Sequence, residues 1–151
     1  QIMKGYLKMP EKTAEVIELI DGYRWYRTGD KGHLDEDGFL TIVDRYSRFA
    51  KIGGEMISLT TVEEEILDAC NDKDLEIAAT CLPDQRKGEK IVLLATNNLD
   101  KNKLTKQLSD AQVNPLYHPA QVLIVEEIPK LGSGKTDFGA TKKIALVNEQ
   151  K

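Results

Sequence analysis

The chain has 151 residues, of which 40% are hydrophobic and 30% charged, and its 21 basic and 25 acidic residues give a net charge of −4. Such a length suits one globular domain with an appended piece. The acidic balance argues against a nucleic-acid-binding protein, which usually carries a basic stripe. We find no apolar run long enough to cross a membrane and no signal peptide, so we expect a soluble piece on the cytoplasmic side. The start lacks an initiator Met, and we expect a fragment of a longer protein.

The first third of the chain predicts short elements. Residues 10–20 are predicted to form a helix, because Pro10 suits a first helical turn. Residues 23–44 alternate short apolar runs with turns, and the polar segment 35–38 is typical of a hairpin turn. A polar run at residues 44–48 then predicts a boundary between this front piece and a C-terminal domain.

The rest of the chain predicts alternating strands and helices. Two extended pieces within residues 48–58 are joined at Gly53 and Gly54, and a helix follows with Thr60 as N-cap and Glu63 completing a capping box. Asp100 is expected to cap a second helix. This alternation predicts an α+β domain of about three strands with flanking helices. The expected strands cover residues 75–82, 90–96 and 121–128, and the later helices cover residues 101–112 and 138–147.

The cysteines and histidines predict no metal site. Cys70 and Cys81 are too few for a disulfide scaffold, and we expect both to be buried, unreactive thiols. His33 and His118 are far apart, and neither has a second ligand at metal-binding spacing.

Lys135 is the candidate catalytic residue of the segment PKLGSGKTDF. It follows Gly132 and Gly134 and lies between the predicted strand 121–128 and a helix that begins at Phe138. Glycine imposes little conformational preference, so we expect a flexible loop that can place a cation against an anion held elsewhere. The alternative is an ordinary surface lysine.

A phosphate-binding P-loop is another interpretation of GSGKT between a strand and a helix. That motif needs a glycine where this chain has Pro129. Proline has no N–H and cannot join the ring of amides that holds the phosphates. We therefore disfavour the P-loop.

Three segments together resemble a known family: YRTGD at residues 26–30, DRYSRFAKIGGE at 44–55 and PKLGSGK at 129–135. In this order they are similar to the C-terminal end of the acyl-adenylate-forming, AMP-binding enzymes, which include acyl- and aryl-CoA synthetases. The phrases KGYLKMPEKTAEVI and RFAKIGGEMIS are most similar to the bacterial bifunctional subfamily of 2-acylglycerophosphoethanolamine acyltransferases and acyl-[acyl-carrier-protein] synthetases. The resemblance covers almost the whole chain.

The resemblance implies a two-step reaction and a domain layout. ATP and a fatty acid give acyl-AMP and pyrophosphate, and a phosphopantetheine thiol of acyl carrier protein or coenzyme A then takes the acyl group. Residues 1–44 would end the N-terminal adenylation domain, 45–48 would be a hinge, and 49–151 would be the mobile C-terminal domain. ATP and Mg would be bound mainly by the N-terminal domain that lies outside this chain. The full-length parent would be associated with the inner membrane through other regions.

The resemblance also assigns roles around the hinge. Asp30 would accept hydrogen bonds from the ribose hydroxyls, and Arg45 would reach the nucleotide. Ser47 occupies the hinge position, where the family usually has Asp or Lys, and Asp44 replaces a usual glycine. The alternatives are a turn-capping aspartate, a surface salt bridge and an ordinary loop serine.

Two loops would serve the two half-reactions. Lys51, Gly53, Gly54 and Glu55 match the thiol-transfer loop, where glycines let the backbone approach a thin pantetheine arm. The alternative for the glycines is a tight bend between strands. Lys135 matches the lysine that stabilises the transition state of adenylation.

The competing functional hypotheses are an acyl-CoA synthetase C-terminal domain and a non-catalytic module that docks a carrier protein. For docking, the polar loop 83–89 and the basic residues Arg45, Arg48 and Lys51 would face an acidic carrier.

Overall fold

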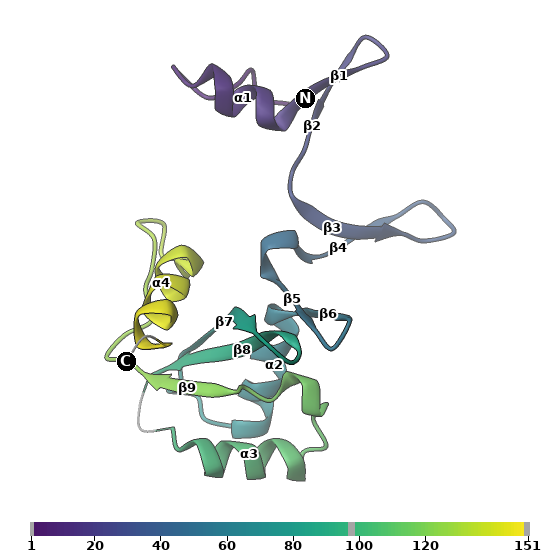
Figure 1. Ribbon diagram of the computed structural model, residues 1–151. Helices are drawn as coiled ribbons and strands as arrows, with labels where there is room; N and C mark the ends of the chain where they lie inside the picture. Colours follow the sequence, from purple (N-terminus) through teal and green to yellow (C-terminus); the bar gives the residue numbers. More distant parts are fainter. Residues whose placement is uncertain (1, 97–98, 150–151) are drawn as a thin grey trace. The chain divides into compact units, whose positions relative to one another are not determined.

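The computed structural model describes residues 2–96 and 99–149. The chain divides into two compact units, Gln1–Ser47 and Arg48–Lys151. The elements of the front unit are helix α1 (Pro10–Val16) and strands β1 (Ile17–Ile20), β2 (Tyr23–Tyr26), β3 (Asp30–Leu34) and β4 (Leu40–Arg45), which form two separate hairpins (Figure 1).

The prediction of a helix through residue 20 was wrong. Helix α1 ends at Val16, and β1 pairs with β2 in antiparallel register. The turn between them is formed by Asp21 and Gly22, whose φ angles of +51° and +79° are those of a type I′ hairpin turn. This turn, together with the β-branched Ile17 and Ile20, favours two strands over a longer helix.

The predicted hairpin around residues 35–38 is confirmed. Strands β3 and β4 pair on either side of it, and the Asp35 carboxylate accepts the backbone N–H of Phe39 at 2.8 Å. At the opposite end of the same hairpin, Asp30 is the cross-strand partner of Arg45. The hairpin register therefore sets the spacing of two candidate nucleotide-binding residues.

The second unit is built on one five-stranded sheet with the strand order β6-β5-β8-β7 and with β9 parallel to β8. The α+β class is confirmed, but the sheet has more strands than predicted because β5 joins it through the pair Ile52 and Gly88. The elements are the 3₁₀ turn η1 (Tyr46–Arg48) at the junction, β5 (Phe49–Ile52), β6 (Glu55–Ser58), α2 (Leu59–Cys70), β7 (Ile77–Asp84), β8 (Gly88–Ala95), α3 (Lys101–Asp110), the 3₁₀ turn η2 (Pro115–Tyr117), β9 (Gln121–Ile124) and α4 (Phe138–Glu149).

Helices cover both faces of this sheet. Helices α2 and α3 pack on one face, against side chains that include Ala79 and Leu93, and α4 packs on the other, against Ala78 and Leu94 (Figure 1). Successive residues along β7, and likewise along β8, thus pack into the two cores on opposite faces of the sheet. This two-sided burial explains why the two strands are continuous apolar runs without polar alternation.

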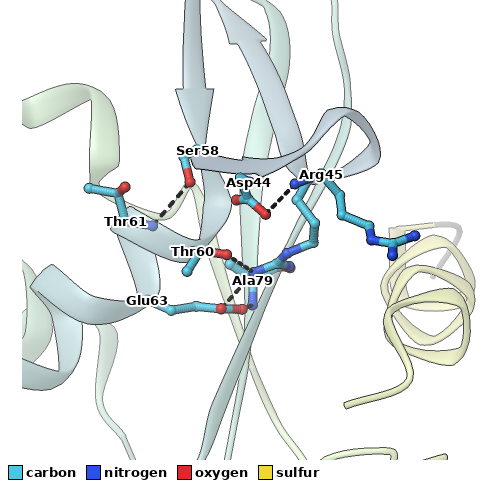
Figure 2. A network of polar contacts seen from close by, with 8 residues as sticks. Asp44, Arg45, Ser58, Thr60, Thr61, Glu63 and Ala79 are labelled. Carbon is cyan, nitrogen blue, oxygen red and sulfur yellow. Dashed lines mark hydrogen bonds and ion pairs between the residues drawn. The ribbon is translucent and has the colours of Figure 1, made fainter. Parts of the chain in front are cut away.

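The first residues of α2 differ from the prediction. The helix begins at Leu59, and the hydroxyl of Ser58 accepts the backbone N–H of Thr61 at 3.2 Å, so Ser58 is the N-cap (Figure 2). Thr60 already lies within the helix, and the predicted capping box with Glu63 was wrong. For α3 the predicted cap is confirmed, because Asp100 accepts the N–H of Lys103 at 2.8 Å.

Strand β9 ends at Ile124, earlier than predicted, because its neighbour β8 ends opposite it at Ala95. Cys81 is buried and Cys70 half-buried, and burial raises the pKa of both thiols. No helix in the described part of the chain is long and apolar enough to span a membrane.

The core predicts a large difference between two Leu→Ala substitutions. Leu108 of α3 is fully buried, whereas Leu146 of α4 is 39% exposed. We expect Leu108→Ala to lower the free energy of unfolding by about 3 kcal/mol, through lost burial and the cavity that remains. Leu146→Ala is the matched control and should cost less than about 1 kcal/mol. Urea unfolding followed by circular dichroism measures both, and equal losses would contradict the assigned core.

Candidate functional site

Asp30 and Arg45 form an ion pair in the front unit. The Arg45 Nε lies 3.2 Å from the Asp30 Oδ1, and the Arg45 side chain is 67% exposed. An exposed pair of this kind contributes little to folding. The geometry instead places a carboxylate, which accepts hydrogen bonds from hydroxyls, beside a guanidinium, which donates to phosphate oxygens. The structure thus brings together the two residues that the sequence suggested for nucleotide binding.

The backbone around this pair is held by local hydrogen bonds. The hydroxyl of Thr28 accepts the N–H of Asp30 at 3.1 Å, and the carbonyl of Gly29 accepts the N–H of Tyr46 at 2.9 Å. Gly29 has a φ of +78°, a conformation that favours glycine. The segment YRTGD therefore specifies the turn that leads into β3.

Ser47 and Arg48 lie at the junction of the two units. Ser47 is exposed, within η1. Arg48 is only 5% exposed, because its guanidinium donates to the carboxylate of Glu63 at 2.5 Å. The hypothesis that Arg48 faces an acidic carrier protein was therefore wrong, and the role of Ser47 as a hinge stays a prediction.

The predicted thiol-transfer loop is a tight two-residue turn between β5 and β6. Gly53 and Gly54 have φ angles of +60° and +94°, which correspond to a type I′ turn. The flanking Lys51 and Glu55 are exposed. Positive φ angles at both positions favour glycine, so the glycines serve the hairpin whether or not a thiol approaches it.

A neighbouring turn holds this loop in place. The Glu89 carboxylate accepts the backbone N–H of Lys51 at 2.6 Å, and the carbonyl of Lys87 accepts the N–H of Gly53 at 2.9 Å. A Cβ added at Gly88 would lie 3.2 Å from the Lys51 carbonyl oxygen. Sequence reasoning missed Glu89, because its contact is 38 residues away and no local pattern marks it.

Glu89 and Asp84 shape the electrostatics of this region. Burial and then the nearby Glu89 carboxylate raise the pKa of the Cys81 thiol, whose sulfur donates to Glu89 at 3.4 Å. Backbone N–H groups of Lys87 and Arg86 lower the pKa of Asp84 and fix the turn between β7 and β8. Arg86 and Lys87 are exposed, and their backbone N–H groups rather than their side chains contact the Asp84 carboxylate.

Lys135 lies on a closed, hydrogen-bonded turn. The N–H of Leu131 donates to the Lys135 carbonyl at 2.7 Å, and the N–H of Gly134 donates to the Leu131 carbonyl at 2.8 Å. These bonds and the bridge between Lys130 and Thr136 give the turn a hydrogen-bonded backbone, and the flexibility expected of this loop stays a prediction. The Lys135 side chain is exposed. Lys135 is therefore an exposed cation on a turn whose backbone is held by hydrogen bonds.

The same bonds bear on the P-loop alternative. The N–H groups of Leu131 and Gly134 donate to carbonyls within the turn, and that of Asp137 donates to the Pro129 carbonyl at 2.8 Å. A P-loop instead directs its backbone N–H groups at phosphate. The observed turn therefore does not have the geometry of a P-loop.

Within residues 2–96 and 99–149, no three His, Cys, Asp or Glu side chains lie together in a way that could hold a metal ion.

The chain is similar to several CoA ligases. No family model matches the chain. It is 36% identical over 144 residues to a 2-succinylbenzoate–CoA ligase from Listeria monocytogenes, covering 94% of this chain and 29% of that protein. It is 33% identical over 138 residues to a long-chain-fatty-acid–CoA ligase from Bacillus subtilis, covering 89% of this chain and 24% of that protein.

A solved structure supports the same relationship. ATP-bound MatB from Rhodopseudomonas palustris matches with a TM-score of 0.72 and 25% identity, over 93% of this chain and 28% of that one. The chain thus spans less than a third of the length of each of these three proteins. Sequence and fold together place the chain in the superfamily of AMP-binding, adenylate-forming acyl- and aryl-CoA ligases, and it corresponds to the C-terminal portion of such enzymes.

Proposed function

We propose that the chain is the mobile C-terminal lid portion of an ATP-dependent ligase that joins a carboxylic acid to the thiol of coenzyme A. The observation that carries this proposal is the exposed Lys135 on its hydrogen-bonded turn, in a chain similar to CoA ligases. The reaction has two steps, formation of acyl-AMP and transfer of the acyl group to the thiol.

Lys135 would act in the first step. A carboxylate oxygen of the acid attacks the α-phosphorus of ATP, and the bond to pyrophosphate breaks. Two anions approach each other, and negative charge builds up on the phosphoryl oxygens. An ammonium group placed there offsets the repulsion and stabilises the transition state. The fixed turn backbone suits this task, because a defined support keeps the cation in position.

Asp30 and Arg45 fit a nucleotide. One oxygen of Asp30 is paired with Arg45, and the carboxylate remains an acceptor that suits the two hydroxyls of a ribose. The exposed guanidinium of Arg45 suits a phosphate oxygen. Mg would be held by the part of the longer protein outside this chain, since the described residues offer no cluster of ligands.

The turn at Gly53 and Gly54 would act in the second step. The thiolate sulfur attacks the acyl carbon, and AMP leaves with the electron pair of the broken C–O bond. A turn without side chains lets a narrow pantetheine arm pass close to the backbone, and a Cβ built at either glycine would meet open space. Rotation about residues 45–48, including Ser47, would move the Lys135 turn away from the reacting groups after the first step and bring the Gly53–Gly54 turn to them for the second.

A carrier protein is a second candidate for the molecule that supplies the acceptor thiol. Exposed Lys51, Arg86 and Lys87 give the region a positive surface, which suits the phosphates of coenzyme A and also an acidic carrier protein. Similarity to CoA ligases favours coenzyme A with an acyl or aryl acid. The segment RFAKIGGEMIS, by its resemblance to acyl-[acyl-carrier-protein] synthetases, favours the carrier protein with a fatty acid.

Lys135→Ala in the longer protein should lower ATP–pyrophosphate exchange at least about a hundredfold, the usual effect of losing one transition-state contact. Thiol transfer from preformed acyl-AMP should stay unchanged. Lys130→Ala is the matched control, because Lys130 lies at the base of the same turn and pairs with Glu76 at 2.8 Å. Equal loss of both half-reactions, or an equal effect of Lys130→Ala, would contradict the proposed role.

The acceptor can be identified by competition. With preformed acyl-AMP, we expect kcat/KM for coenzyme A to exceed that for acyl carrier protein by at least about tenfold, or about 1.4 kcal/mol of transition-state stabilisation. A preference for the carrier protein would reject coenzyme A and support the second candidate.

Substitutions in the β5–β6 turn should affect the second step. Gly54→Ala places a Cβ at a φ of +94° and should slow thiol transfer while ATP–pyrophosphate exchange continues. Gly22→Ala in the β1–β2 turn is the control, because Gly22 also has a positive φ of +79° and a Cβ there would also meet open space. Rapid-quench measurement of both steps tests this, and normal transfer by Gly54→Ala would argue against a thiol passing the turn.

A further inference from the structure

Arg48 is buried in a polar cluster to which the proposed function assigns no role. Its Nη1 donates to the carbonyl of Ala79 at 2.8 Å, and its Nη2 donates to Glu63 at 2.5 Å. The other Glu63 oxygen accepts the N–H of Ala79 at 2.6 Å, a contact drawn in Figure 2. The two side chains therefore satisfy both backbone groups of one residue in β7, which is the last strand in the sheet order.

The remaining face of the Arg48 guanidinium lies on an aromatic ring. Its carbon Cζ is 3.7 Å from the centroid of the Phe138 ring, a cation–π contact at close range. Phe138 is the first residue of α4 and follows Lys135 by three positions. Arg48 thus contacts the helix that begins directly after the lysine turn.

The contacts continue to the lysine itself. Asp137, beside Phe138, donates its N–H to the Pro129 carbonyl at 2.8 Å and accepts the N–H of Ala140 at 2.9 Å. The first bond closes the base of the Lys135 turn and the second joins Asp137 to the first turn of α4, so Asp137 links the start of the helix to the turn. A shift of the Phe138 ring would therefore move the turn.

We propose that Arg48 and Phe138 are positioning residues for Lys135, and this inference rests on the adenylation role proposed for that lysine. Stacking of the guanidinium on the ring fixes the start of α4 against the edge of β7. Arg48 is also the first residue of the second unit, directly after Ser47. The Lys135 turn is thereby tied to the residue that directly follows Ser47, the proposed hinge position.

The test uses Phe138→Leu in the longer protein. Leucine keeps apolar bulk at this position but removes the ring face, and the pairing of Arg48 with Glu63 remains. We expect the kcat of ATP–pyrophosphate exchange to fall between about tenfold and a hundredfold, as for a misplaced catalytic group. The KM for ATP and thiol transfer from preformed acyl-AMP should be unchanged. Phe138→Tyr keeps an aromatic face and should restore exchange.

Tyr117→Leu is the matched control, because Tyr117 is a partly buried aromatic residue that packs against the other core, on the face covered by α2 and α3. It should leave both half-reactions unchanged. The inference is overturned if Phe138→Leu exchanges at the wild-type rate. It is also overturned if both half-reactions and the unfolding midpoint fall together, since that is the mark of a purely structural role.

Lys135→Ala in the same series separates this inference from the proposed function. If Lys135→Ala abolishes exchange but Phe138→Leu does not reduce it, only the positioning role fails. If Lys135→Ala leaves exchange intact, the adenylation role fails and the positioning role fails with it.

Discussion

The buried ion pair between Arg48 and Glu63 is the constraint on which the second unit depends. Together the two side chains contact β7 and α2, and Arg48 stacks on the first residue of α4. Removing one partner of such a pair typically costs about 3–5 kcal/mol, because the other charge is left buried. Because breaking the pair is costly, the elements that meet at it (α2, β7 and the start of α4) keep a defined arrangement.

This arrangement explains how one small unit would serve two steps. The Lys135 turn is attached to α4, and the Gly53–Gly54 turn is attached to the β7–β8 turn through Glu89. Both turns have defined backbones, so neither needs to fold around a substrate. Movement between the steps would then come from the junction at residues 45–48, and each turn would be delivered as a preformed surface.

The elements of the second unit were predictable where local chemistry decides them. Apolar runs marked β7 and β8, and Asp100 marked the start of α3, because burial and capping leave local patterns. Long-range partners were not predictable. Glu63 matched a capping box by spacing, yet its carboxylate contacts Ala79, 16 residues away. Arg48 gave the pattern of a surface cation, and only the folded chain shows that it is buried.

The candidate site residues also divide into those that the local sequence marks and those that it does not. Lys135, Asp30 and Arg45 were found through short motifs, and the pairing of the last two follows from the β3–β4 register. Phe138 and Glu89 carried no such signal, since each acts through a partner distant in sequence. The hydrogen-bonded conformation of the Lys135 turn was also missed, because its glycines permit many conformations and the local sequence does not mark the one observed.

In the proposed first step, the Lys135 ammonium reaches the reacting groups while the acid is activated. A crystal structure of the longer protein with a non-hydrolysable acyl-AMP analogue tests this most directly. We expect the Lys135 Nζ within about 3 Å of an acyl or phosphoryl oxygen, on the same hydrogen-bonded turn. A bound analogue with a different cation at that position, and Lys135 in solvent, would contradict it.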